Sequence, residues 1–255
     1  MNIANYSEFR KRRKRMLRGI ATAIVASGVA LGIALGCYKH IEPSIVQEPV
    51  VAQGSEQQSK TLQHYVVCLD PGHGMSNRTA GVYDPGAVYN SFREADYVLG
   101  FAQELGLLLK NKTYEVVLTR SSEHEDCPLY SRANNALESN SNIFISLHVN
   151  AAPGSSASGP RTFYSTEHDR ELAIYIQGEL VRKLEQIFGN IYPSSLETRV
   201  IREPDFVVLR TTQQIPSVLV ELGFVTNSFD RQYLLTKRSE LEEALLTAIN
   251  KYFKS

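Results

Sequence analysis

The chain of 255 residues contains no tryptophan and only three cysteines, and its formal net charge at pH 7 is zero. So few cysteines exclude a small scaffold built on disulfide bonds. No internal repeat is visible. The chain does contain 43% hydrophobic and 21% charged residues, so it can bury a core and is neither disordered nor of low complexity. Its length fits one domain of ordinary size with an additional segment.

The zero net charge hides an asymmetry along the chain. Residues 1–18 hold seven Lys or Arg and one acidic residue, which gives +6, and the remaining residues hold 20 basic and 26 acidic groups, which gives −6. A nucleic-acid-binding domain should be basic. The acidic body of this chain therefore argues against nucleic acid as a partner.

An uncharged apolar stretch follows the basic segment 1–18. Residues 19–36 contain no charge, and as a helix they would be about 27 Å long, close to the apolar thickness of a bilayer. The preceding basic residues predict that residues 1–18 stay cytoplasmic and that 19–38 form a transmembrane helix. We therefore expect a single-pass protein of the cell membrane whose remaining residues form an extracytoplasmic domain. A cleaved signal segment is the first alternative and lipid attachment at Cys37 the second, which would make the protein secreted or lipid-anchored.

Residues 39–63 differ in composition from what precedes and follows them. They include Pro43, Pro49 and Gly54 and show no apolar periodicity, which predicts a flexible linker. Residues 64–255 then remain for a single folded domain.

Within 64–255, short apolar runs alternate with segments of helical periodicity. We expect helices at 93–110, 129–137, 170–187 and around 241–253, and strands at 65–69, 114–118, 143–147, 162–164, 207–209 and 218–221. Strands without polar alternation, separated by helices, predict an α/β fold with a mostly parallel twisted sheet and helices on both faces. The functional site of such a sheet lies at the carboxyl ends of its strands.

Polar residues that packing does not require stand at those strand ends. His73 follows the first strand, His148 the third, Glu221 ends the last, and Glu94 opens the first helix. A catalytic zinc site needs three nitrogen or oxygen ligands, an open position for water and a base beside it. The four residues lie far apart in the sequence, so the spacing does not force them together. A carboxylate as deep in an apolar run as Glu221 is costly unless it has a partner or a function.

Interpretations without a catalytic role stay open for several of these residues. Either histidine could be a loop or capping residue, and Glu94 could be an acid that the helix dipole favours in a first turn. Ser146 and His148 share one strand face without a strand-to-helix elbow, which disfavours a serine triad. We expect Cys68 to be a core residue. A disulfide between Cys68 and Cys127 is an alternative if the domain lies outside the cell.

Taken together and in order, motifs between residues 65 and 253 resemble the zinc-dependent N-acetylmuramoyl-L-alanine amidases of bacterial cell-wall metabolism, of the amidase 3 type. The motifs are Leu-Asp-Pro-Gly-His-Gly at 69–74, Arg-Glu at 93–94, Leu-Thr-Arg at 118–120, Ser-Leu-His-Val-Asn-Ala at 146–151 and Pro-Ser-Val-Leu-Val-Glu-Leu-Gly-Phe-Val-Thr-Asn at 216–227. Several separated motifs in the right order are far more specific than any one of them.

The resemblance implies a zinc ion bound by His73, Glu94 and His148, with Glu221 as the catalytic carboxylate. It also implies peptidoglycan as the substrate, cleaved between N-acetylmuramic acid and L-alanine. Asn150 and Arg210 match positions near the cleft. These six residues are the site residues that we expect.

The chain departs from the family pattern at residues 75–87, where it is longer. This segment borders the expected metal site, so we expect it to reshape the substrate cleft. Residues 196–205 are expected to form a loop that could cover the cleft. Two other functions remain open: a zinc peptidase or deacylase acting on another wall amide, and a catalytically silent, membrane-tethered domain that binds the wall.

Overall fold

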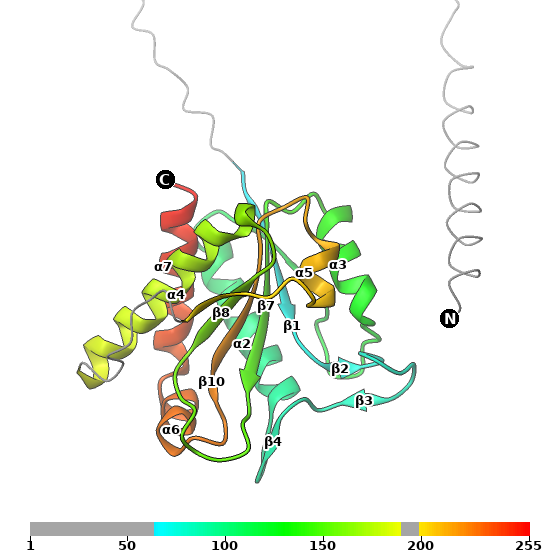
Figure 1. Ribbon diagram of the computed structural model, residues 1–255. Helices are drawn as coiled ribbons and strands as arrows, with labels where there is room; N and C mark the ends of the chain where they lie inside the picture. The colour runs from blue at the N-terminus through cyan, green and yellow to red at the C-terminus, as the bar shows by residue number, and fades with distance from the viewer. Residues whose placement is uncertain (1–63, 190–198) are drawn as a thin grey trace, which may run out of the picture. The chain divides into compact units, whose positions relative to one another are not determined.

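A six-stranded sheet forms the centre of the molecule, with its strands in the order β6-β1-β7-β10-β8-β9 (Figure 1). The computed structural model describes residues 64–189 and 199–255. The strands are β1 (Val66–Pro71), β6 (Glu115–Leu118), β7 (Ile143–Asn150), β8 (Arg161–Tyr164), β9 (Val200–Arg202) and β10 (Ser217–Phe224). Strands β6, β1, β7 and β10 run parallel, β8 is antiparallel to β10, and β9 is parallel to β8. The sheet is therefore mixed, with the predicted parallel arrangement in four of its strands.

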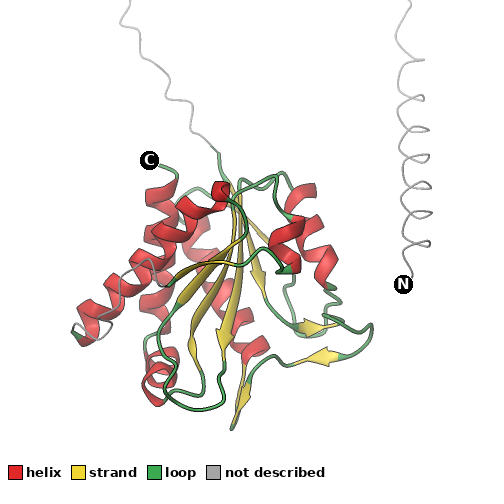
Figure 2. Cartoon of the chain, viewed as in Figure 1, coloured by secondary structure: helices red, strands yellow, loops and turns green. Residues whose placement is uncertain are grey.

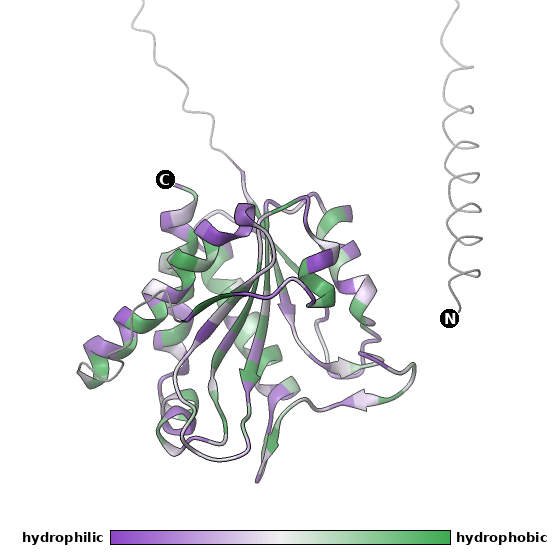
Figure 3. Cartoon of the chain, in the orientation of Figure 1, coloured by the Kyte–Doolittle hydropathy of each residue, from purple (hydrophilic) through white to green (hydrophobic). Residues whose placement is uncertain are grey.

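Helices cover both faces of this sheet, as predicted (Figure 2). They are α2 (Glu94–Lys110), α3 (Leu129–Glu138), α4 (Glu167–Phe188), α5 (Val207–Thr211), α6 (Ser228–Thr236) and α7 (Arg238–Tyr252). One core lies beneath α2, α4 and α7 and includes the fully buried Ile145 and Leu172. A smaller core lies beneath α3 and α5 and includes Phe144 and Leu219. Hydrophobic residues accordingly gather in the central strands and in the helices beside them (Figure 3).

Alternate residues of each inner strand thus enter different cores. In β7, Ile143, Ile145 and Leu147 enter the larger core, whereas Phe144 enters the smaller one. Because both faces are covered, the strands need apolar residues at nearly every position until they reach their carboxyl ends. There polar residues replace apolar ones on the face that carries Phe144.

Two short antiparallel ribbons stand beside the main sheet. Gly74–Met75 (β2) pairs with Tyr83–Asp84 (β3), and Val88–Tyr89 (β4) pairs with Phe92–Arg93 (β5). Both lie in the chain between β1 and α2. The longer segment 75–87 thus forms the β2–β3 ribbon together with the turn that leads into β4.

Residues 207–209, predicted as a strand, belong instead to helix α5. Val208 and Leu209 are buried in the smaller core, which a short helix achieves as well as a strand. A short apolar run does not distinguish the two by periodicity, so this prediction was wrong. Helix α6 was not predicted; the side chain of Asn227 caps it by accepting the backbone N–H groups of Phe229 and Asp230.

Cys68 and Cys127 are both free thiols and both buried, so the alternative of a disulfide between them is wrong. The Cys127 thiol donates to the carbonyl of Thr119 at 3.2 Å, which occupies its sulfur within the fold. Cys68 is a core residue of β1, as expected. Burial and the nearby charge of Asp70 raise the pKa of the Cys68 thiol far above its ordinary value.

The predicted segments 1–18, 19–38 and 39–63 lie outside the described residues, as does part of the predicted loop 196–205. Strand β9 forms within the remaining part of that loop. Among the helices of 64–189 and 199–255, none is both long enough and apolar enough to cross a membrane.

Candidate metal centre

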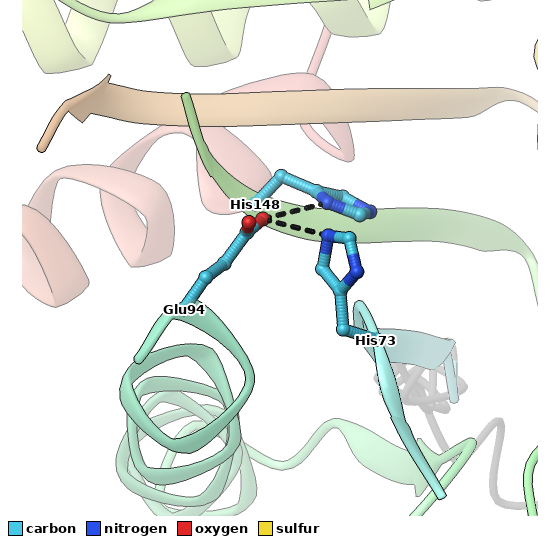
Figure 4. Close-up of side chains that lie close together, drawn as sticks. All are labelled: His73, Glu94 and His148. Carbon is cyan, nitrogen blue, oxygen red and sulfur yellow. Dashed lines mark hydrogen bonds and ion pairs between the residues drawn. The ribbon is translucent and has the colours of Figure 1, made fainter. Parts of the chain in front are cut away.

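Three side chains from three separate elements converge at the carboxyl end of the sheet (Figure 4). His73 follows β1, Glu94 is the first residue of α2, and His148 lies on β7. Glu94 Oε1 is 3.1 Å from His73 Nε2 and 2.9 Å from His148 Nδ1. All three ligand atoms lie within 4.8 Å of one another. The fold therefore brings together the three residues that the sequence placed far apart.

A strained turn held by two buried arginines places His73. Its φ of 60° lies in the left-handed region, which costs a residue other than glycine on the order of 1 kcal/mol. Arg120 donates to the carbonyls of Pro71 at 2.9 Å and Gly72 at 2.8 Å. Arg132 donates to the carbonyls of Pro71 and of His73 itself. Both guanidinium groups are buried, so they fix the backbone of the turn from beneath.

Asp84 holds the other nitrogen of the His73 ring. Asp84 Oδ2 lies 3.0 Å from His73 Nδ1 and also accepts from Asn77 Nδ2 at 2.7 Å, while Oδ1 accepts the backbone N–H of Gly86. A carboxylate in this position sets the tautomer and orientation of a metal-binding histidine. Sequence reasoning missed Asp84, although Asp-Pro-Gly at 84–86 repeats Asp-Pro-Gly at 70–72.

Glu94 is held by two backbone groups as well as by the histidines. Its Oε2 accepts from the N–H of Ala87 at 2.7 Å, and its Oε1 accepts from the N–H of Val149 at 2.9 Å. Burial by itself raises the pKa of Glu94, but the hydrogen bonds and charges of His148 and His73 outweigh it, and the pKa is strongly lowered. This carboxylate is therefore ionised, as a metal ligand must be.

Two glycines make room for the cluster. A Cβ on Gly72 would stand 2.3 Å from His148 Cε1, and a Cβ on Gly86 would stand 2.5 Å from Glu94 Oε2. Real Cβ atoms do not approach other atoms this closely. The backbone therefore has to be glycine at both positions for the three side chains to meet.

Glu221 stands beside the cluster. The parallel pairing of β10 with β7 places Glu221 directly opposite His148. Its Oε2 is buried and has no hydrogen-bond partner among the described residues. Burial and the nearby Glu94 carboxylate raise the pKa of Glu221 well above its ordinary value, and Arg161 opposes that shift. A buried carboxylate without a partner is costly, and such a group marks a functional position.

The donor atoms suit zinc. Two imidazole nitrogens and one carboxylate oxygen are a common ligand set for a catalytic zinc ion, which keeps its fourth position open. Donors bonded to one zinc ion at about 2.0–2.2 Å lie roughly 3–4 Å apart, and the two contacts of Glu94 Oε1, at 2.9 and 3.1 Å, are close to that range. The Asp84 contact completes the usual support of a zinc-binding histidine.

The remaining expected site residues are less closely tied to the cluster. Asn150 ends β7, and its Oδ1 accepts from the N–H of Ala151 at 2.8 Å. Arg210 is exposed on α5, and among the described residues no hydrogen bond or ion pair joins it to the three side chains of the cluster. Their roles stay predictions. Ser146 donates to Asp70 Oδ2 at 2.6 Å rather than to a histidine, which agrees with the argument against a serine triad.

Comparison with known proteins identifies the family. Residues 67–251 match the model of the family Amidase_3, described as N-acetylmuramoyl-L-alanine amidase. The uncharacterized protein YqiI of Bacillus subtilis is 34% identical over 205 residues, which cover 77% of this chain and 89% of YqiI. The probable cell wall amidase LytH of Staphylococcus epidermidis is 29% identical over 199 residues, 77% of this chain but only 61% of LytH.

Solved structures agree in fold with this chain. The CwlD amidase of Clostridioides difficile, solved in complex with the GerS lipoprotein, is 27% identical with a TM-score of 0.64, covering 75% of this chain and 99% of CwlD. A second solved structure is the catalytic domain of the N-acetylmuramoyl-L-alanine amidase CwlV from Bacillus (Paenibacillus) polymyxa var. colistinus. It is 26% identical with a TM-score of 0.62, and the match covers 74% of this chain and 98% of the CwlV chain. With the family model matched over most of its length, this chain belongs to the Amidase_3 family and is an N-acetylmuramoyl-L-alanine amidase.

Proposed function

We propose that this chain hydrolyses the amide between N-acetylmuramic acid and L-alanine in peptidoglycan with a zinc ion held by His73, Glu94 and His148. Glu221 serves as general base and then as general acid. The observation that carries the proposal is the convergence of the three donor groups within 4.8 Å, next to a buried carboxylate oxygen without a partner.

The chemistry divides between the ion and the protein. Zinc bound at this centre would polarise the scissile carbonyl and lower the pKa of a bound water toward about 7. Glu221 accepts the proton of the attacking water and delivers a proton to the departing nitrogen of L-alanine. An amine leaves poorly as an anion, so the second transfer matters as much as the first. The raised pKa of Glu221 suits a group that must hold a proton between two steps.

Neighbouring groups orient the metal-binding atoms of His73 and Glu94 toward the position of the ion. Asp84 accepts the Nδ1 proton of His73, which leaves Nε2 to face the ion. The N–H groups of Ala87 and Val149 restrain the Glu94 carboxylate. The centre is therefore organised by the protein before substrate arrives.

The substitution Glu221→Gln tests the assigned base. It removes proton transfer while preserving shape, so we expect turnover to fall by about 10²–10⁴-fold with zinc retained. Dye release from labelled peptidoglycan measures turnover, and elemental analysis measures zinc. His148→Ala is the matched control and should lose both zinc and activity. An active Glu221→Gln enzyme would overturn the assignment of Glu221.

A digest of purified peptidoglycan, with and without a chelator, identifies the bond. An amidase frees intact stem peptides that begin with L-alanine and leaves unsubstituted glycan, which mass analysis detects. A peptidase would instead yield shortened stems, a deacylase on another wall amide would leave the stems attached, and a silent wall-binding domain would release nothing. Release that is insensitive to the chelator would contradict the role of zinc.

We also propose that residues 19–38 anchor the protein in the cell membrane, with residues 1–18 cytoplasmic and the catalytic domain extracytoplasmic. The uncharged 18-residue stretch and the +6 charge before it support this orientation. Residues 39–63 then act as a linker between the anchor and the catalytic domain.

A further inference from the structure

Three chemically active side chains form one row across adjacent strands. The β7–β10 register pairs His148 with Glu221, and the β10–β8 register pairs Glu221 with Arg161. Residues paired across neighbouring strands point to the same face of a sheet and lie about 5 Å apart. Arg161 therefore stands one strand beyond the assigned base, and about 10 Å from the β7 end of the row.

Arg161 is held in place without being neutralised. Its guanidinium carbon lies 4.8 Å from the ring centroid of Phe224, a cation–π contact that restrains the side chain. Phe224 itself is buried. Among the described residues, Arg161 forms no ion pair and no side-chain hydrogen bond. Its N–H groups are therefore available to a ligand on the same face of the sheet as Glu221.

The charge around the cluster indicates what Arg161 would bind. Glu94 and Asp84 supply negative charge that a bound zinc ion would offset, whereas Arg161 has no ion-pair partner among the described residues. An anionic part of the substrate would therefore find its partner at Arg161. A guanidinium fork matches a carboxylate through two parallel hydrogen bonds. Arg161 is placed to supply such a fork.

The substrate carries a group of this kind at a suitable distance. The muramoyl group and L-alanine are uncharged beside the scissile bond. The acidic residue that follows L-alanine in the stem peptide has an α-carboxyl group, which is an anionic carboxylate when free and a neutral carboxamide when amidated. Two extended residues span about 7 Å. The distance from Glu221 to the guanidinium of Arg161 is made up of one strand spacing and part of the arginine side chain, which is a similar length.

We propose that Arg161 binds the free carboxylate of the stem-peptide residue that follows L-alanine, and so makes the enzyme prefer a stem with this acid unamidated. The inference rests on the proposed function, because it needs the muramoyl–L-alanine bond to lie at Glu221. It adds a specificity residue on β8 that contacts the substrate away from the reacting atoms.

Two disaccharide tripeptides test the inference. Both carry L-alanyl-γ-D-glutamyl-L-lysine on muramic acid, and one has its glutamyl α-carboxylate amidated. We expect the wild-type enzyme to favour the free acid by about ten- to a hundredfold in kcat/KM. The preference should lie mainly in KM, because the contact is made equally in the ground and transition states.

Variants then assign the preference to one side chain. Arg161→Gln should abolish the preference, and Arg161→Lys should keep only part of it, because lysine retains the charge without the fork. Arg170→Gln, at an exposed position of α4, is the charge-matched control and should keep the full preference. If Arg161→Gln does not fold, Arg161→Lys carries the test, and an unchanged preference in that variant overturns the proposal.

The outcomes separate this proposal from the proposed function. Equal cleavage of both substrates by the wild type overturns the carboxylate contact alone. An equal fall of kcat on both substrates in Arg161→Gln also overturns it, because Arg161 would then act on Glu221 or on the fold. Cleavage of neither substrate, with no stem release from intact peptidoglycan, counts instead against the proposed function.

Discussion

Two glycines decide whether the three side chains of the metal centre can come together. Gly72 is the clearest case, because the imidazole of His148 occupies the space that any side chain there would need. Gly86 plays the same part for Glu94, and its φ of 65° adds a backbone reason for glycine. The centre thus depends on the space between backbone and side chains as well as on the ligands.

Gly72→Ala should disturb the centre while leaving the fold in place. The added methyl group must displace the His148 ring, so we expect zinc affinity to fall by about 10- to 100-fold, as when a metal ligand loses its support. Competition with a chromogenic chelator measures the affinity. Gly106→Ala is the control, since its Cβ would lie 3.4 Å from Val116 Cγ1, in α2 and away from the cluster. Wild-type affinity in Gly72→Ala would show that His148 is not a ligand.

At the scale of elements, the buried Asp70 joins β1 to its neighbours beneath the His73 turn. Its Oδ1 accepts from Thr119 just after β6 and from Arg132 of α3, and its Oδ2 accepts from Ser146 of β7. Burial alone would raise the pKa of Asp70, but the charge of Arg132 and these hydrogen bonds lower it below its ordinary value. Three strands and a helix are therefore coupled to one ionised carboxylate.

This coupling predicts a dependence of stability on pH. Because the pKa of Asp70 is lower in the folded state, its stabilisation is complete above the unfolded value of about 4 and is lost as the pH falls further. In metal-free protein, Asp70→Asn should be less stable by about 3–5 kcal/mol at pH 7. It should then lose less stability than the wild type between pH 4 and pH 2.

Urea unfolding of both proteins across this pH range measures the effect. A chelator in every sample keeps zinc release from contributing to the acid dependence. Asp205→Asn, at an exposed position, should follow the wild type. Parallel curves for the wild type and Asp70→Asn would show that Asp70 does not carry the predicted acid sensitivity.

At the scale of the whole molecule, the proposed anchor and linker govern where the amidase acts. A flexible linker of the length of residues 39–63 has an average span of about 25–30 Å. An enzyme tethered in this way reaches only the part of the wall nearest the membrane. The acidic body and the basic first 18 residues are consistent with opposite sides of that membrane.

Fractionation of producing cells tests the tether. The full-length chain should sediment with the membranes, whereas a chain lacking residues 1–38 should be soluble and still release stems from isolated peptidoglycan. Cys37→Ala should not change the membrane fraction of the full-length chain. A shortened mature protein in the medium would favour a cleaved signal, and release by Cys37→Ala would favour a lipid anchor.

Sequence by itself determined the alternation of strands and helices, because apolar runs and helical periodicity are local properties. It also indicated His73, Glu94, His148 and Glu221, because polar groups at strand ends have no packing reason to be there, and because the family motifs surround them. Only the structure could show that the three donor groups meet, since their separation of 21 and 54 residues is bridged by strand order.

Tertiary structure alone decided the rest. The run at 207–209 is a helix, although burial beside Leu219 would satisfy a strand equally well, so its apolar residues alone did not specify the conformation. Strand β8 joins the sheet antiparallel, which local sequence does not specify either. The contact of Asp84 with His73 depends on how the β2–β3 ribbon folds beside the sheet. The position of Arg161 opposite Glu221 depends on the register of β8 with β10 in the main sheet. Register is set by the packing of the entire sheet, so no short stretch of sequence carries it.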